Sequence, residues 1–314
     1  MWFKCAQIFE LVDEFDLNPE QLAQELKHLA FKPCGTHDLK SLGWISPMPV
    51  QDAPLVHGAQ SCLLVCLRQE EKVIPASMVK EETAARVQAL ENKSGKKLRK
   101  RERDEIKEDV FQGLVARALC KSSQTYAYLD TKAKWLIVDA ASAKKAEDLV
   151  TLLRKSLGSF RVKRPDLQTI PTLLTHWVRS NEYPADFVIA DSCQIKDLEE
   201  GGTISCKKHN LLCPEIQSLL EGPREISQLA LAWQEQVSFQ LNADLVVKSI
   251  RFLELIRDQA NDLVTESAQD RFDADFVIMV AVLRELISSL LHHFAKPAEQ
   301  ASNDASSSAE AVNA

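Results

Sequence analysis

The sequence predicts an α+β fold, because strand-like and helix-like stretches alternate without the regular strand–helix repeat of a doubly wound parallel sheet. Apolar residues make up 45% of the 314 residues and charged residues 26%, as in an ordinary globular protein. This length suits two or three domains. A long, highly charged helical stretch separates two predicted strands. We therefore expect a multi-domain protein with a long helical arm inserted between strands.

Residues 1–76 and 122–165 are expected to form a central α+β domain. Trp2–Val12 partly alternates apolar and polar residues, which favours a strand. Asn18 can cap a helix whose first turn contains Pro19. The apolar face of that helix would contain Leu22, Leu26 and Leu29.

The remainder of this domain is expected to alternate strands with one further helix. Gly43–Pro54 is predicted to be a proline-rich loop, Gln60–Gln69 a strand, and Thr125–Asp139 a hairpin that turns near Lys132–Lys134. Ala143–Leu157 is predicted to be a helix, capped by Ser142 and stopped by Gly158.

Residues 77–121 are predicted to form the helical arm. Apolar residues recur at helical spacing on either side of Ser94-Gly95, where the two halves meet. This pattern fits a helical hairpin or one kinked helix. In both cases the most basic stretch of the chain lies at or just after the junction, so positive charge is concentrated where the two halves of the arm meet.

Residues 166–258 are predicted to form a second α+β domain, residues 259–296 a helical region broken near Arg271–Asp275, and residues 297–314 a disordered tail. The elements expected in the second domain are two helices, Leu173–Arg179 and Glu215–Leu220, and four strands, Phe187–Ala190, Thr203–Lys207, Glu225–Gln240 and Leu245–Leu255.

Positive charge is concentrated although the net charge is -7. Lys93–Arg103 contains seven basic residues and one acid, and Lys144–Arg164 contains seven basic residues and two acids. Such clusters on an acidic protein suit a phosphate backbone, although a solvated helix face paired with the acids after Arg103 is the alternative. The candidate phosphate contacts in the first cluster are Lys96, Lys97, Arg99, Lys100 and Arg101.

The eight cysteines are irregularly spaced, and acids in the first residues replace the apolar run of a secretory signal. We expect free thiols and a cytoplasmic location. Cys62 and Cys66 have an even separation within a predicted strand, so they should share one buried face. Phe276–Phe294 is interrupted by charges, so no membrane span is expected.

Catalytic and metal motifs are absent. The sequence contains no G-x-x-x-x-G-K-[ST], G-x-G-x-x-G, G-x-S-x-G or H-E-x-x-H, so no enzyme and no cofactor is expected. Cys206, His209 and Cys213 lack paired knuckles and a fourth zinc ligand, so no metal site is expected there. Asp273 and Asp275 suit an ion pair or helix cap better than a nuclease metal site.

Several segments then occur in one order that resembles a known family. They are WFK at Trp2–Lys4, FKPCG at Phe31–Gly35, GWISPM at Gly43–Met48, EEKVIP at Glu70–Pro75, SQT at Ser123–Thr125, ASAKKAEDLVTLLRKSLGS at Ala141–Ser159, ALAWQE at Ala230–Glu235 and RFDADF at Arg271–Phe276. Together they resemble the recombination-associated protein RdgC family over residues 1–294.

The resemblance implies a non-enzymatic, nucleoid-associated homodimer that closes into a ring. Its positively lined hole would take up double-stranded DNA without sequence preference and restrain strand exchange promoted by RecA. The alternative is a scaffold that binds RecA directly, with DNA binding incidental.

The resemblance also assigns residues. It implies that Lys208 and Arg224 contact DNA, with Lys207 and His209 beside them, and that Arg117 lies near the opposite dimer contact. Here the sequence departs from the family pattern: ARAL replaces a PRAF-like stretch, so Leu119 stands where an aromatic residue is usual in the dimer interface.

Overall fold

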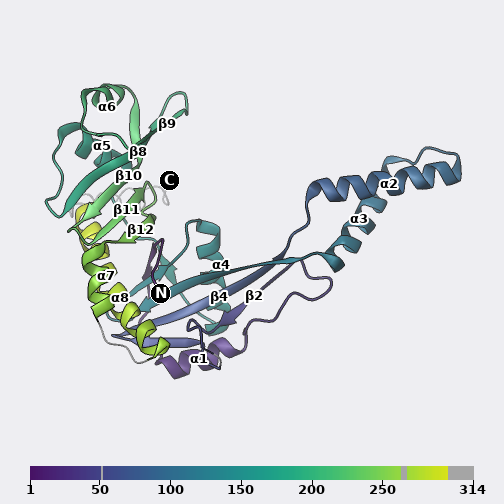
Figure 1. The fold of residues 1–314 in the computed structure, drawn as a ribbon, viewed down its shortest axis with the longest axis horizontal. Coiled ribbons are helices and arrows are strands. Elements are labelled where there is room, and N and C mark those ends of the chain that lie inside the picture. Colours follow the sequence, from purple (N-terminus) through teal and green to yellow (C-terminus); the bar gives the residue numbers. More distant parts are fainter. Residues whose placement is uncertain (51, 263–266, 296–314) are drawn as a thin grey trace, which may run out of the picture.

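The computed structural model describes residues 1–50, 52–262 and 267–295. In this part of the chain, two antiparallel sheets are combined with eight helices (Figure 1). The mixed helix and sheet class predicted from the sequence is therefore confirmed. The predicted tail, residues 297–314, lies outside the described residues.

The central sheet has seven strands in the order β2-β4-β5-β6-β1-β7, with β3 also paired to β4. β2 and β3 pair with successive parts of β4, which is long enough to hold both along one edge. The strands are β1 (Gln7–Leu11), β2 (Lys40–Ile45), β3 (Val56–Ala59), β4 (Cys62–Lys72), β5 (Cys120–Asp130), β6 (Trp135–Val138) and β7 (Val162–Lys163).

One face of the central sheet is covered by α1 (Pro19–Lys27) and α4 (Ala143–Leu157). Both helices have the predicted caps. The Asn18 side chain accepts a hydrogen bond from the Gln21 amide, and the Ser142 side chain accepts one from the Lys145 amide. Each helix buries an apolar face against the sheet, and the predicted Ala143–Leu157 helix is confirmed in full.

The prediction of a loop over Gly43–Pro54 is wrong at its start, since Gly43 and Ile45 lie in β2. A side chain at position 43 would place its Cβ 2.3 Å from the Phe31 Cα. The glycine therefore allows close contact between the strand and the segment after α1 and does not mark a turn.

The helical insertion between β4 and β5 is a hairpin of α2 (Ala76–Ser94) and α3 (Lys100–Arg117), as one of the two sequence alternatives expected. Gly95 ends α2 in the left-handed region at φ 66°, which glycine adopts without steric cost. Figure 1 shows the hairpin extending away from the sheets. Its own buried core contains Val79, Val110 and Leu114.

The second sheet has five strands in the order β12-β11-β10-β8-β9. β8 (Phe187–Asp197) is longer than predicted, and β9 (Thr203–Lys207) is as predicted. The predicted strand Glu225–Gln240 is two strands, because residues 234 and 235 turn the chain with positive φ. The other strands are β10 (Arg224–Trp233), β11 (Val237–Asn242) and β12 (Val247–Phe252), and the helices beside them are α5 (Ile170–Ser180) and α6 (Pro214–Leu219).

After α7 (Glu254–Asp262), the chain ends its described part in α8 (Ala268–Phe294). The predicted break near Arg271–Asp275 is wrong, because α8 passes through it, with Asp275 buried in contact with the Met1 amine at 2.9 Å. Of the helices that the structure describes, none combines the length and apolar composition that a bilayer crossing requires.

α8 packs against both sheets. Phe276 lies 6.3 Å from Tyr128 of β5, measured between ring centroids, and Phe294 lies 5.3 Å from Trp177 of α5. One continuous apolar cluster therefore joins the second sheet, α8 and the face of the central sheet opposite α1 and α4. Cys62 and Cys66 are buried on that face, as predicted, and burial raises the pKa of each thiol to about 12.

Candidate nucleic-acid interface

The basic residues singled out from the sequence lie in several places, of which the hairpin end and the β8–β9 region hold the two densest groups of candidate contacts. Lys96, Lys97, Arg99, Lys100 and Arg101 are all exposed at the far end of the α2–α3 hairpin. Lys207 is the last residue of β9, and Lys208 and His209 follow it. In Figure 1 the β8–β9 hairpin and the helical hairpin project toward the same side of the molecule.

Acids neutralise part of the charge at the end of the helical hairpin. Arg101 forms an ion pair with Glu105 at 3.1 Å, and Arg103 forms one with Glu91 at 2.8 Å. The Leu98 backbone amide and the Arg103 guanidinium hold the pKa of Glu91 below its usual value. Lys96, Lys97 and Lys100 have no carboxylate within 4.0 Å among the described residues, so they carry the uncompensated charge.

Lys207 and Lys208 border a polar hollow of about 500 Å³ on the second sheet. Its lining also includes Gln228, Gln240 and Arg251 from β10, β11 and β12. Lys208 is in the left-handed region at φ 53°, where the chain leaves the strand. His209 turns away from the strand, and its Nδ1 lies 3.0 Å from the Asn210 carbonyl oxygen.

The strand register shows why these side chains share one face. Paired residues in an antiparallel sheet point to the same side. Lys207 pairs with Ser192, Gln240 with Lys248, and Ser238 with Arg251. The opposite face carries the buried residues Cys193, Leu229 and Leu241, which belong to the core. We call the polar side, with Lys196, Lys207, Lys208, Lys248 and Arg251, the open face.

Sequence reasoning missed Lys248 and Arg251. They lie three residues apart in β12, a spacing that places two residues on opposite sides of a regular strand. Ser249 has a positive φ of 53°, and the pairing with β11 shifts register here, so both bases reach the open face. The alternation in VKSIRF indicated a strand, but the irregularity that unites its bases has no sequence signal.

Arg224 has a different environment from Lys208. Its Nε donates to Asp197 Oδ2 at 3.0 Å, and its side chain is one-third exposed. The backbone amide of Glu200, then the Arg224 guanidinium and the Glu199 amide, hold the pKa of Asp197 below its usual value. Arg224 thus stabilises the turn between β8 and β9, on which the position of Lys207 and Lys208 depends.

The second basic zone, Lys144–Arg164, is partly neutralised. Arg161 pairs with Asp13, and Lys163 pairs with Glu10 at 2.8 Å. Lys144, Lys145 and Lys155 of α4 have no carboxylate within 4.0 Å in the part of the chain that the structure describes. In the view of Figure 1, α4 lies between the second sheet and the helical hairpin.

Arg117 and Leu119 lie at the base of the helical hairpin. Arg117 reaches Glu82 at 3.7 Å and remains largely exposed. Leu119 is 83% exposed, an unusual position for a leucine. Both border a mostly apolar groove of about 540 Å³ that also includes the half-exposed Val73 and Met78. This surface has the apolar character of a contact with another protein.

The residues weighed for metal chemistry have other contacts. Asp273 pairs with His57 at 2.8 Å, and Asp275 pairs with the Met1 amine. Cys206 pairs across the strands with Cys193, whereas Cys213 lies 3.7 Å from the His209 Nδ1. Neither set forms a group of three ligands in the described residues, although Cys34, Glu70 and Cys120 do.

Comparison with known proteins finds relatives that match most of the chain. A family model described as "Putative exonuclease, RdgC" matches residues 1–296. "Recombination-associated protein RdgC" from Serratia proteamaculans (strain 568) is 39% identical over 293 residues, covering 93% of this chain and 97% of the relative. The proteins of the same name from Yersinia enterocolitica and Aeromonas hydrophila are 39% and 38% identical, with 93% and 92% of this chain covered and 97% and 96% of the relatives. The chain therefore belongs to the RdgC family of recombination-associated proteins.

Proposed function

We propose that this protein binds double-stranded DNA without sequence preference, through the open face and the α4 lysines. The observation that carries the proposal is the convergence of Lys207 and Lys208, at the end of β9, and Arg251, from β12, on one polar hollow. Amino and guanidinium groups beside amide side chains suit phosphate oxygens. These basic side chains would contact phosphates and not nucleobases, so affinity should vary little with DNA sequence.

The proposal includes a homodimeric ring, in which Leu119 and the apolar groove at the hairpin base form one subunit contact. An exposed leucine beside a groove on the same surface fits a self-complementary interface. The positive surfaces would line the hole, so that closure retains the DNA without base contacts. The hairpin-end lysines would attract the duplex as it approaches.

Binding of a fluorescent duplex to the double variant Lys207→Glu/Lys208→Glu tests the proposed surface. Loss of two phosphate contacts should lower the slope of log affinity against log salt by about 1.8 and weaken binding equally on unrelated sequences. Lys27→Glu reverses one charge at an exposed position in the last turn of α1, outside the proposed surface. This control variant should bind DNA as the parent does. Unchanged affinity, or loss on one sequence alone, would contradict the proposal.

Leu119→Arg tests the ring. The charged side chain should prevent the apolar contact and lower the molecular mass measured by light scattering. DNA retention on circular duplexes should fall with it. A parent protein that is monomeric at micromolar concentration would contradict the proposed assembly.

We further propose that the protein is not an enzyme and restrains RecA-promoted strand exchange by occupying DNA, at the nucleoid. Purified protein should leave linear duplex intact with Mg²⁺, because Asp273 and Asp275 are paired with His57 and the Met1 amine. The variant that cannot bind DNA should no longer restrain RecA. Persistent inhibition by that variant would favour a scaffold that contacts RecA directly, and magnesium-dependent degradation would favour an exonuclease.

A further inference from the structure

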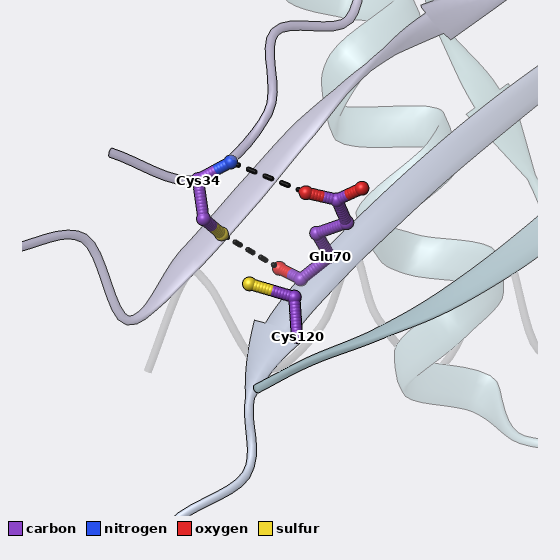
Figure 2. A group of neighbouring side chains, drawn as sticks. All are labelled: Cys34, Glu70 and Cys120. Atoms are coloured by element: carbon purple, nitrogen blue, oxygen red, sulfur yellow. Dashed lines mark hydrogen bonds between the residues drawn. The ribbon is translucent and has the colours of Figure 1, made fainter. Parts of the chain in front are cut away.

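Three side chains from different segments meet beside the hairpin base, away from the open face. Figure 2 shows Cys34 from the segment after α1, Glu70 from β4 and Cys120 from the start of β5. Their two Sγ atoms and a Glu70 carboxylate oxygen all lie within 4.8 Å of one another. Among the described residues, this is the one group of three or more histidine, cysteine or acidic side chains with that geometry.

The fold holds each of the three groups in place. Glu70 is buried, and its Oε2 accepts a hydrogen bond from the Cys34 backbone amide at 3.2 Å. The Cys34 thiol donates to the Glu70 carbonyl oxygen at 3.5 Å. Strand pairing places Cys120 opposite Lys72, two residues from Glu70, on the same side of the sheet. The cluster is therefore organised before any ion binds.

The separations suit a tetrahedral metal site. Zinc binds thiolate sulfur at about 2.3 Å and carboxylate oxygen at about 2.0–2.2 Å, so its ligand atoms stand roughly 3.5–3.8 Å apart. Ligand atoms already within 4.8 Å need to approach by about 1.3 Å at most. The exposed side of Cys120 leaves room for entry of the ion and for a water in the fourth position.

The Glu70 carboxylate has one oxygen directed toward Cys34 and the other held by an arginine. Two basic side chains lie near the cluster. Arg68 pairs with the other Glu70 oxygen, Oε1, at 2.9 Å, and Lys72, which is paired with Cys120 in the sheet, donates to the carbonyl oxygens of Thr36 and Val115. Glu70 Oε2 thus remains directed toward Cys34, where it can bind an ion without breaking the arginine contact.

We propose that Cys34, Cys120 and Glu70 form a site for a thiophilic divalent cation of the zinc class, with one ion per chain. Binding converts both thiols to thiolates and releases their two protons to solvent, with no change in oxidation state. The ion would join the segment after α1 to β4 and to the first residue of β5. Since Cys120 directly follows Leu119, the site would brace the base of the helical hairpin.

Cobalt titration of the reduced, metal-free, full-length protein tests the site. We expect one Co²⁺ per chain, with the thiolate charge-transfer and visible bands of a tetrahedral site, and displacement of these bands by Zn²⁺. Cys34→Ser and Cys120→Ser should each weaken binding by more than about tenfold, and Glu70→Gln by roughly tenfold. Cys213→Ser, which removes a half-buried thiol outside the cluster, should bind as the parent does.

Three results would overturn the proposal. The first is the absence of thiolate–cobalt bands at excess metal, and the second is unchanged affinity in Cys34→Ser/Cys120→Ser. The third is a Cys34–Cys120 disulfide, seen by mass spectrometry, that forms in air even with zinc present. Circular dichroism of each variant separates loss of the site from loss of the fold.

Discussion

The end of the α2–α3 hairpin and the open face of the second sheet both carry several basic side chains, but the elements that hold them are packed to different extents. The hairpin has a buried core of three side chains, Val79, Val110 and Leu114. The second sheet shares an apolar cluster with α8 and the central sheet. The denser charge in the sequence thus lies on the less buried element.

This difference separates two roles of positive charge. A base on a well-packed sheet loses less conformational freedom when it binds a phosphate than a base on a lightly packed helix. The hairpin bases are also mixed with acids such as Glu91 and Glu105. We expect the hairpin to affect how fast DNA arrives and the open face to affect how long it stays.

The largest effect on stability should come from shortening a buried side chain in the apolar cluster shared by the two sheets, compared with one in the hairpin core. Leu64→Ala, in the shared cluster, should lower the free energy of unfolding by about 2–5 kcal/mol. Leu114→Ala, in the hairpin core, should leave global unfolding nearly unchanged and raise amide exchange in α2 and α3. Urea unfolding and hydrogen exchange measure both. Equal losses of global stability would show that the hairpin folds as one unit with the sheets.

Single charge reversals compare the two basic surfaces directly. Arg251→Glu should lower the salt slope of DNA affinity by about 0.9 and shorten the lifetime of the complex. Arg101→Glu, whose side chain is 90% exposed, should mainly slow association at low salt. Stopped-flow kinetics separates these effects. A slower association for Arg251→Glu with an unchanged lifetime would reverse the assignment.

The Arg224–Asp197 pair offers a smaller, pH-dependent test of the β8–β9 support. The folded-state pKa of Asp197 is depressed, so its contribution to stability is present above the unfolded value of about 3.9 and is lost as pH falls through the folded value. Arg224→Gln should therefore reduce stability at pH 6. The difference from the parent should shrink below pH 4, as measured by urea unfolding. A difference that persists at pH 2 would implicate packing and not charge.

The smallest effect is expected at the hairpin turn. Gly95 has φ 66°, and beyond its chain neighbours no atom lies within 4 Å of the position that a Cβ would take, so alanine meets no steric obstacle there. Gly95→Ala should cost about 1 kcal/mol through the left-handed backbone alone, within the hairpin. Amide exchange near residues 93–99 should increase, with DNA lifetime unaffected. Gly113→Ala, on the surface of α3, is the matched control and should stabilise the helix slightly.

Local signals in the sequence predicted the parts of the fold that depend on local interactions. Asn18, Ser142 and Gly95 mark helix ends that the structure confirms, because caps and turns depend on neighbouring residues. β2 and the start of α8 were mispredicted for the opposite reason. Gly43 is required by contact with Phe31, and Asp275 is stabilised by a charge at the other end of the chain.

The residues of the candidate sites also differ in how far the sequence could predict them. Lys207 and Lys208 were assigned from the family resemblance, and they lie at and just after the end of β9. Arg251 joins them only through strand pairing and an irregular residue in β12. Cys34, Glu70 and Cys120 are separated by 36 and 50 residues in the sequence, with no metal motif, so their proximity depends on the packing of the segment after α1 against β4.

The helix α8 has a mechanical consequence. Phe276 packs against the central sheet, and Phe294 packs against α5 in the cluster shared with the second sheet. Rotating one sheet relative to the other would therefore expose apolar surface along α8. We therefore expect the two sheets and α8 to move as one rigid unit, whereas the α2–α3 hairpin at one end can bend. If two such units enclose DNA, the movement that admits the duplex is expected at the hairpin or at the subunit contacts. The distance across each rigid unit should stay constant.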